Sequence, residues 1–92
     1  MNKKMTVKTQ RGIAYVVLSD ARSVDEQILE VFGYDGKHGM WAGIEGEAIK
    51  VMDYFVQETL ATFPILSVED TDEPVSLKWN YVLVAPEGGL PS

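Results

Sequence analysis

Short stretches of alternating or continuous apolar residues near both ends of the chain are typical of β-strands. Residues 6–9 alternate β-formers with polar side chains, and residues 13–18 form a continuous apolar run rich in β-branched side chains. Gly12 ends the short turn between them, which predicts a hairpin. Residues 65–68 and 75–84 are a second pair of strand candidates, and the longer one alternates apolar and polar positions over most of its length. One hairpin is therefore expected near each end.

A helix is predicted directly after the first hairpin. Ser23 and Glu26 have the spacing of a capping box, in which each residue satisfies a free amide of the first turn. Gly33 suits the left-handed residue that commonly follows a helix. Apolar residues at helical spacing lie between these signals, so the sequence predicts a helix over Val24–Phe32.

A second, longer helix is predicted from Glu45 or Glu47 to Phe63. Its apolar residues follow steps of three and four, and Pro64 prevents its continuation. Tyr54 falls on the opposite, exposed face. The residues expected to face the core are Ala48, Ile49, Met52, Phe55, Val56, Leu60 and Phe63.

The expected order of elements is strand, strand, helix, helix, strand, strand. This order predicts an α+β fold, a two-layer sandwich in which a four-stranded antiparallel sheet (ββααββ) carries two helices on one face. With 92 residues, 46% of them apolar, the chain suits a single domain over residues 1–92. Residues 86–92 contain two prolines and two glycines and are expected to form a mobile tail.

Composition and charge narrow the classes of partner. The chain carries 14 acidic and 8 basic side chains, a formal net charge of −6, which disfavours direct binding to nucleic acid. It has no apolar run of about 20 residues and no apolar segment behind its basic start, so neither a membrane partner nor a signal peptide is expected. The absence of cysteine suits a reducing compartment, and we expect a cytoplasmic protein.

The glycine-rich loop over residues 33–41 is the first candidate binding site. Glycine allows close backbone approach, so such a loop can present aromatic and ionisable side chains at the surface. Its candidate residues are Tyr34, Asp35, Lys37, His38 and Trp41. His38 beside Asp35 could serve acid/base chemistry, but no nucleophile signature accompanies the pair. No catalytic residue, metal ion or cofactor is predicted, because one histidine, no cysteine and this glycine spacing match no known ligand set.

The acidic segment between the last two predicted strands is the second candidate. It concentrates four carboxylates, which we expect at a hairpin tip: Glu69, Asp70, Asp72 and Glu73. Carboxylates can stand where phosphates would in the groove of a basic partner. Residues 1–22 carry five basic side chains against one acid, so the two regions neutralise each other if they pair.

Nine aromatic residues are more than a two-layer domain of this size is expected to bury. Together with an uncovered sheet face, they favour a small acidic, non-catalytic binding or interaction protein that forms a homodimer through its sheet. Two alternatives stay open. One is an acidic inhibitor or nucleic-acid mimic that blocks a basic partner, and the other is a small enzyme or ligand-binder that uses the loop over residues 33–41.

Overall fold

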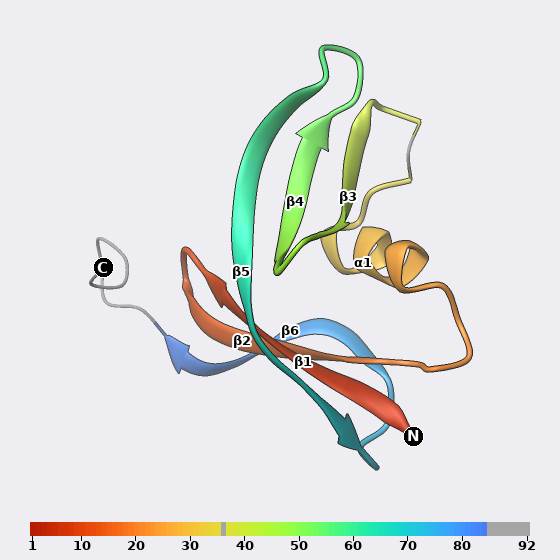
Figure 1. Ribbon diagram of the computed structural model, residues 1–92, viewed down its shortest axis with the longest axis vertical. Coiled ribbons are helices and arrows are strands. Elements are labelled where there is room, and N and C mark those ends of the chain that lie inside the picture. Colours follow the sequence, from red (N-terminus) through yellow and green to blue (C-terminus); the bar gives the residue numbers. More distant parts are fainter. Residues whose placement is uncertain (36, 85–92) are drawn as a thin grey trace.

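The computed structural model describes residues 1–35 and 37–84, and the tail expected at residues 86–92 lies outside them. The described elements form one antiparallel sheet in the order β3-β4-β5-β1-β2-β6, together with one helix (Figure 1). The elements are β1 (Asn2–Thr9), β2 (Gly12–Leu18), α1 (Val24–Phe32), β3 (Met40–Glu45), β4 (Ala48–Asp53), β5 (Glu58–Thr71) and β6 (Ser76–Val84).

The predicted four-stranded sheet with two helices is wrong. The described residues contain six strands and one helix, and the segment predicted as a second helix forms β4 and the first part of β5. Ile49 and Val51 are both buried, at alternate positions, as a strand requires, whereas residues two apart would lie on opposite faces of a helix. The chain also reverses direction at Gly46, which has a φ of 63° and lies in the two-residue hairpin loop between β3 and β4.

The long strand β5 changes partner in its middle. Residues 58–64 pair with β4, and the strand pairs with β1 from Ile65 to Thr71. Pro64 lies at the exchange point, where its missing N–H costs no ladder bond. This change of partner on the curved strand β5 divides the sheet into an arm, made of β3, β4 and residues 58–64, and a base, made of β1, β2, β6 and residues 65–71 (Figure 1).

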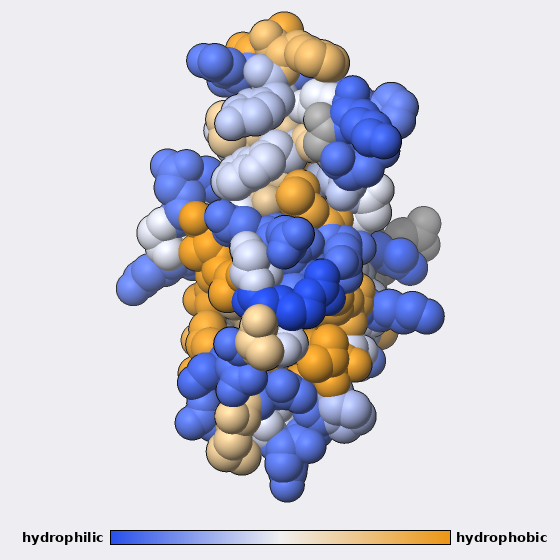
Figure 2. All heavy atoms as spheres, turned by 90° about the vertical axis from the view of Figure 1, so that its right-hand side faces the viewer, coloured by the Kyte–Doolittle hydropathy of each residue, from blue (hydrophilic) through white to orange (hydrophobic). Residues whose placement is uncertain are grey.

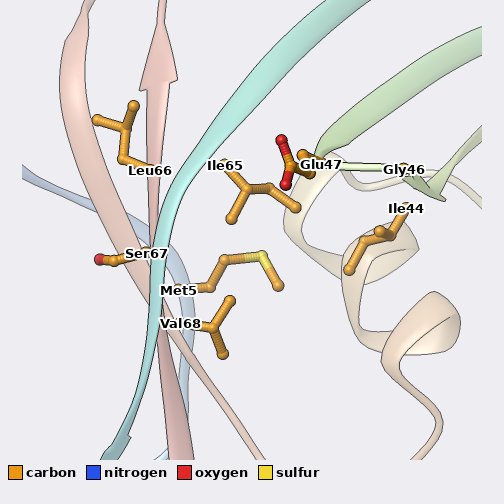
Figure 3. A pocket seen from close by; sticks show the side chains of 8 residues that line it. All are labelled: Met5, Ile44, Gly46, Glu47, Ile65, Leu66, Ser67 and Val68. Atoms are coloured by element: carbon orange, nitrogen blue, oxygen red, sulfur yellow. The ribbon is translucent and has the colours of Figure 1, made fainter.

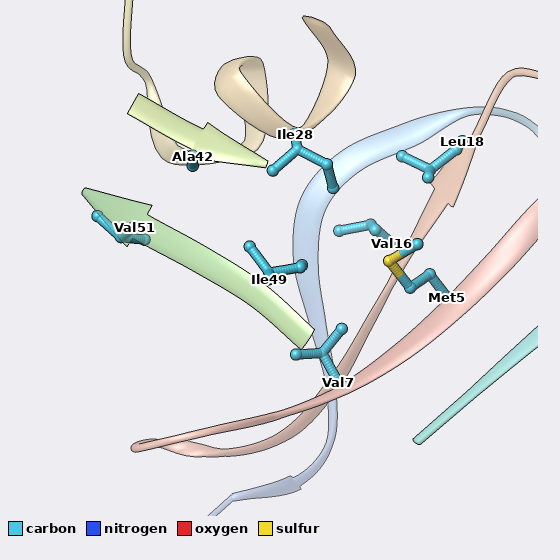
Figure 4. Close-up of a cluster of buried hydrophobic side chains, with 8 residues drawn as sticks. All are labelled: Met5, Val7, Val16, Leu18, Ile28, Ala42, Ile49 and Val51. Carbon is cyan, nitrogen blue, oxygen red and sulfur yellow. The ribbon is translucent and has the colours of Figure 1, made fainter. Parts of the chain in front are cut away.

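Helix α1 lies in the angle between arm and base and packs against β3 and β6, the two edge strands of the sheet (Figure 1). Its Ile28 is fully buried in a core that draws side chains from both parts of the sheet (Figure 4). The rest of this cluster comprises Met5, Val7, Val16, Leu18, Ala42, Ile49 and Val51. One short helix therefore covers the concave face that two helices were expected to cover.

The bounds predicted for the first helix, Val24–Phe32, are confirmed. The Ser23 side chain accepts a hydrogen bond from the Glu26 amide at 3.4 Å. After the last turn, Gly33 takes a left-handed conformation, and the amides of Gly33 and Tyr34 donate to the carbonyls of Glu30 and Leu29. This is the paired bonding of a Schellman motif, and it satisfies carbonyls that the helix end would otherwise leave free.

Phe32, the last residue of α1, joins arm to base through aromatic contacts. Its ring lies 5.6 Å from the Phe63 ring on β5 and 5.8 Å from the Trp79 ring on β6, centroid to centroid. It also stacks on Tyr34 at 5.6 Å. Aromatic pairs at such distances contribute about 0.5–1.5 kcal/mol each beyond the area they bury.

The buried polar residue Gln27 fixes where β2 ends and α1 begins. It is fully buried, and its side-chain amide accepts from the Ser19 N–H at 2.7 Å and donates to the Ser19 carbonyl at 2.9 Å. Its nitrogen also lies 3.3 Å from the carbonyls of Arg22 and Ser23. The Gln27 side chain thus bonds both backbone groups of Ser19, as a neighbouring strand would. The sequence pattern did not predict this role.

Replacing Gln27 with alanine should lower the free energy of unfolding by about 3 kcal/mol, because it removes the side-chain partners of the part-buried N–H and carbonyl of Ser19. Chemical denaturation monitored by circular dichroism measures this loss. Gln10→Ala, at an exposed turn position, is the matched control and should change stability by less than about 0.5 kcal/mol. Equal effects of the two substitutions would contradict the role given to Gln27.

Candidate functional site

The far end of the arm is a hairpin turn built without glycine, proline or asparagine. The Asp53 carboxylate accepts hydrogen bonds from the amides of Phe55 at 3.0 Å and Val56 at 3.4 Å. Gln57 has a positive φ of 54°, a backbone conformation that residues other than glycine rarely adopt. The amide of Tyr54 donates to the carbonyl of Gly39, which ties the turn to the end of the loop before β3. The turn is therefore held in place by specific bonds.

This turn carries apolar side chains that folding does not bury. Phe55 is 79% exposed, Val56 65% and Tyr54 60%, and Leu60 at the start of β5 is also exposed. Tyr54 stacks on Trp41 of β3, with the ring centroids 6.4 Å apart. Figure 2 shows apolar side chains capping the arm. We call this surface the aromatic patch; its members are Trp41, Tyr54, Phe55, Val56 and Leu60.

Two glycines seat the rings of the aromatic patch. A Cβ atom on Gly39 would lie 2.4 Å from the Phe55 ring, and one on Gly43 would lie 2.3 Å from the Trp41 indole. Both distances are far inside van der Waals contact, so each ring occupies space that only glycine leaves open. Because Gly43 follows Trp41 by two residues on β3, both lie on the same face of the strand, away from the buried Ala42.

The loop predicted as a site is divided by the structure. Tyr34 turns inward to stack on Phe32, whereas Trp41 belongs to β3 and the aromatic patch. Asp35 and His38 remain at the surface, with Oδ1 and Nδ1 3.3 Å apart, and the His38 side chain is 85% exposed. The Asp35 carboxylate also accepts from the Lys37 amide at 2.8 Å, and this bond is the main reason that its pKa is lowered.

This arrangement offers little to catalysis. An exposed carboxylate whose pKa is lowered stays ionised, and a histidine beside it lacks the enclosed, water-poor site in which general acid/base groups act. The described residues contain no group of three metal-ligating side chains and no helix long and apolar enough to cross a bilayer.

The acidic segment is not a hairpin tip as predicted, because β1 and β2 lie between β5 and β6 in the sheet, and its four residues are spread over two environments. Glu69 and Asp70 lie within β5, and Asp72 and Glu73 lie in the connection to β6. Asp70 is paired with Lys3 and Glu73 with Lys4, so strand β1 places part of the basic N-terminal segment directly beside them. The hydrogen bond from Lys3 is the main cause that lowers the pKa of Asp70.

The sequence predicted exposure correctly for Tyr54 but not for its neighbours. Phe55, Val56 and Leu60 were expected in the core because they fit the spacing of a helix, and the structure places all three at the surface. The available signal was the β-branched content of the segment, which includes Val51, Thr59 and Thr62.

No family model matches the sequence, and comparison with curated proteins and with solved structures finds no similar chain or fold. The function is therefore inferred from the surfaces described above.

Replacing Gly43 with alanine should displace the Trp41 indole and weaken its stack on Tyr54, because the new Cβ occupies the position of the ring edge. Near-ultraviolet circular dichroism reports the loss as a weaker aromatic signal. Gly33→Ala is the control. No atom lies within 4 Å of the Cβ that this substitution adds, but an alanine at the φ of 72° should cost about 1 kcal/mol of stability. An unchanged aromatic signal in Gly43→Ala would show that the indole does not rest on this glycine.

Proposed function

We propose that this protein is a non-catalytic interaction protein that forms a homodimer through the aromatic patch of its arm. The observation that carries the proposal is the exposure of Phe55, at 79%, on a turn held by defined hydrogen bonds. Contiguous exposed apolar side chains of this kind are often interaction sites in folded proteins.

The composition of the patch supports a protein partner. Trp, Tyr and Phe are enriched at the centres of protein interfaces, where their large rings contribute much of the binding energy. Trp41 and Tyr54 are already stacked on each other, and the Phe55 ring rests on Gly39, so little side-chain freedom remains to be lost on binding. The unfavourable φ of Gln57 also fits a turn selected for its surface rather than for stability.

A second copy of the chain is the partner that we favour. In a symmetric dimer the same patch meets itself, so its rim must offer both signs of charge. Lys37 lies in the loop before Gly39, while Asp53 and Glu58 flank the turn. The two signs can therefore pair across a twofold axis without a net repulsion at the interface.

The outer face of the base supports dimerisation less well. The residues on this face are polar or charged at most positions, among them Lys4, Thr6, Ser67, Glu69 and Asn80. We therefore place the dimer contact on the arm of the sheet rather than on the outer face of its base. We assign the protein to the cytoplasm, supported by a sequence without cysteine.

The two other functions find less support. An acidic inhibitor would need its carboxylates free, whereas Asp70 and Glu73 are engaged by Lys3 and Lys4 of the same chain. A catalytic or ligand-binding loop would need its candidate residues together, whereas Tyr34 turns inward and His38 points into solvent.

The double substitution Phe55→Ser with Val56→Ser should convert a dimer into a monomer, because it removes the two most exposed side chains of the patch. Sedimentation velocity over a range of concentrations measures the change. We expect the dissociation constant to rise at least about 100-fold, since truncation of an interface hot spot costs about 2 kcal/mol or more and two are truncated.

Two controls accompany this experiment. Val75→Ser removes an exposed apolar side chain far from the arm and should leave the dimer unchanged. Gln57→Gly relieves the positive φ while keeping every ring, so it should dimerise and be more stable. A wild-type chain that stays monomeric at millimolar concentration would refute the homodimer.

A further inference from the structure

Part of the edge of β5 lacks a strand partner. The Ile65 amide donates to the Glu47 carbonyl at 2.9 Å on one edge, while Ile65 pairs with Val7 of β1 on the other. Ile65 thus has neighbours on both edges, and β4 ends at this point. Beyond it, up to Thr71, β1 is the only described strand that pairs with β5. The opposite edge of residues 66–71 therefore presents unpaired backbone groups.

An apolar groove lies directly beside this edge. It has a volume of about 460 Å³ and opens between β5 and the hairpin loop that joins β3 to β4 (Figure 3). Met5, Ile65 and Val68 point into it from one side, and Ile44 lies across from them (Figure 3). The exposed Glu47 is the one ionisable residue among those that line it.

We infer that this edge of β5 binds an extended peptide segment of a partner protein, which adds to the sheet as a further strand. The main chain of the segment would bond to residues 66–71, and every second side chain would enter the groove, so apolar residues are required at alternate positions. A lysine or arginine of the segment would pair with Glu47. This site is separate from the aromatic patch and goes beyond the proposed function.

The charge of the edge argues for a basic segment and against a second copy. Glu47 lines the groove, Glu69 and Asp70 follow on β5, and Asp72 comes directly after the strand, while Lys3 pairs with Asp70. Two antiparallel copies of this edge would bring these carboxylates together, which costs free energy. A basic segment is instead attracted, both locally and by the net charge of −6.

The test uses a fluorescein-labelled ten-residue peptide with valine at alternate positions, threonine between them and lysine at both ends. Fluorescence anisotropy should show saturable binding to the wild-type chain. Replacing two threonines of the peptide with proline should abolish binding, because proline cannot donate to a sheet ladder. Glu47→Lys in the protein should weaken binding about tenfold, the effect of losing one charge-assisted contact. This substitution should leave the fold intact, because Glu47 is exposed.

Two further measurements test the inference. Hydrogen exchange of the amides of residues 66–71 should slow when the peptide is bound. The Phe55→Ser, Val56→Ser variant should bind the peptide as well as the wild type does, so this site and the dimer can fail independently. Absence of binding, equal binding of the proline peptide, or a dimer whose interface protects residues 66–71 would overturn the inference.

Discussion

Burial of one face of α1 between the two edges of a bent sheet is the interaction on which the rest of the structure depends. The helix has nine residues, too few to be stable alone in water, so its stability comes from packing. Ile28 is fully enclosed, and Phe32 contacts Phe63 of the arm and Trp79 of the base. These contacts also hold arm and base at their angle. Gln27, on the same helix, fixes the preceding chain through Ser19.

The change of strand partner at Pro64 and Ile65 shapes both the aromatic patch and the groove beside β5. Because β5 leaves β4 there, the arm projects beyond the reach of α1, and side chains near its end have no second layer to pack against. The same departure frees the edge of residues 66–71 and opens the groove beside it. One change of strand partner thus produces a projecting apolar tip and an unpaired strand edge.

Local signals in the sequence were sufficient for α1, β2 and β6, whereas the first strand was predicted only over residues 6–9 and begins at Asn2. Ser23 and Gly33 marked the ends of the helix correctly, and the apolar runs located β2 and β6 to within about two residues. The second helix failed because apolar residues between Ala48 and Phe63 fit a helical period as well as two strands. Residues 54–57 between those strands contain no glycine, proline or asparagine, and the turn instead relies on the Asp53 side chain and the left-handed Gln57.

The candidate site could be predicted only in part, because its residues come together through the hairpin that the sequence concealed. Trp41 was selected from the glycine-rich loop and Tyr54 from the polar face of a helix, yet they stack on each other across paired strands. Phe55 and Val56 looked like core residues, since composition alone does not tell a buried side chain from one presented at a turn. A fold under selection for stability alone would favour glycine at the position of Gln57 and polar residues at 55 and 56. Phe55 and Val56 instead remain exposed at the tip of the arm, and the proposed contact surface rests on this exposure.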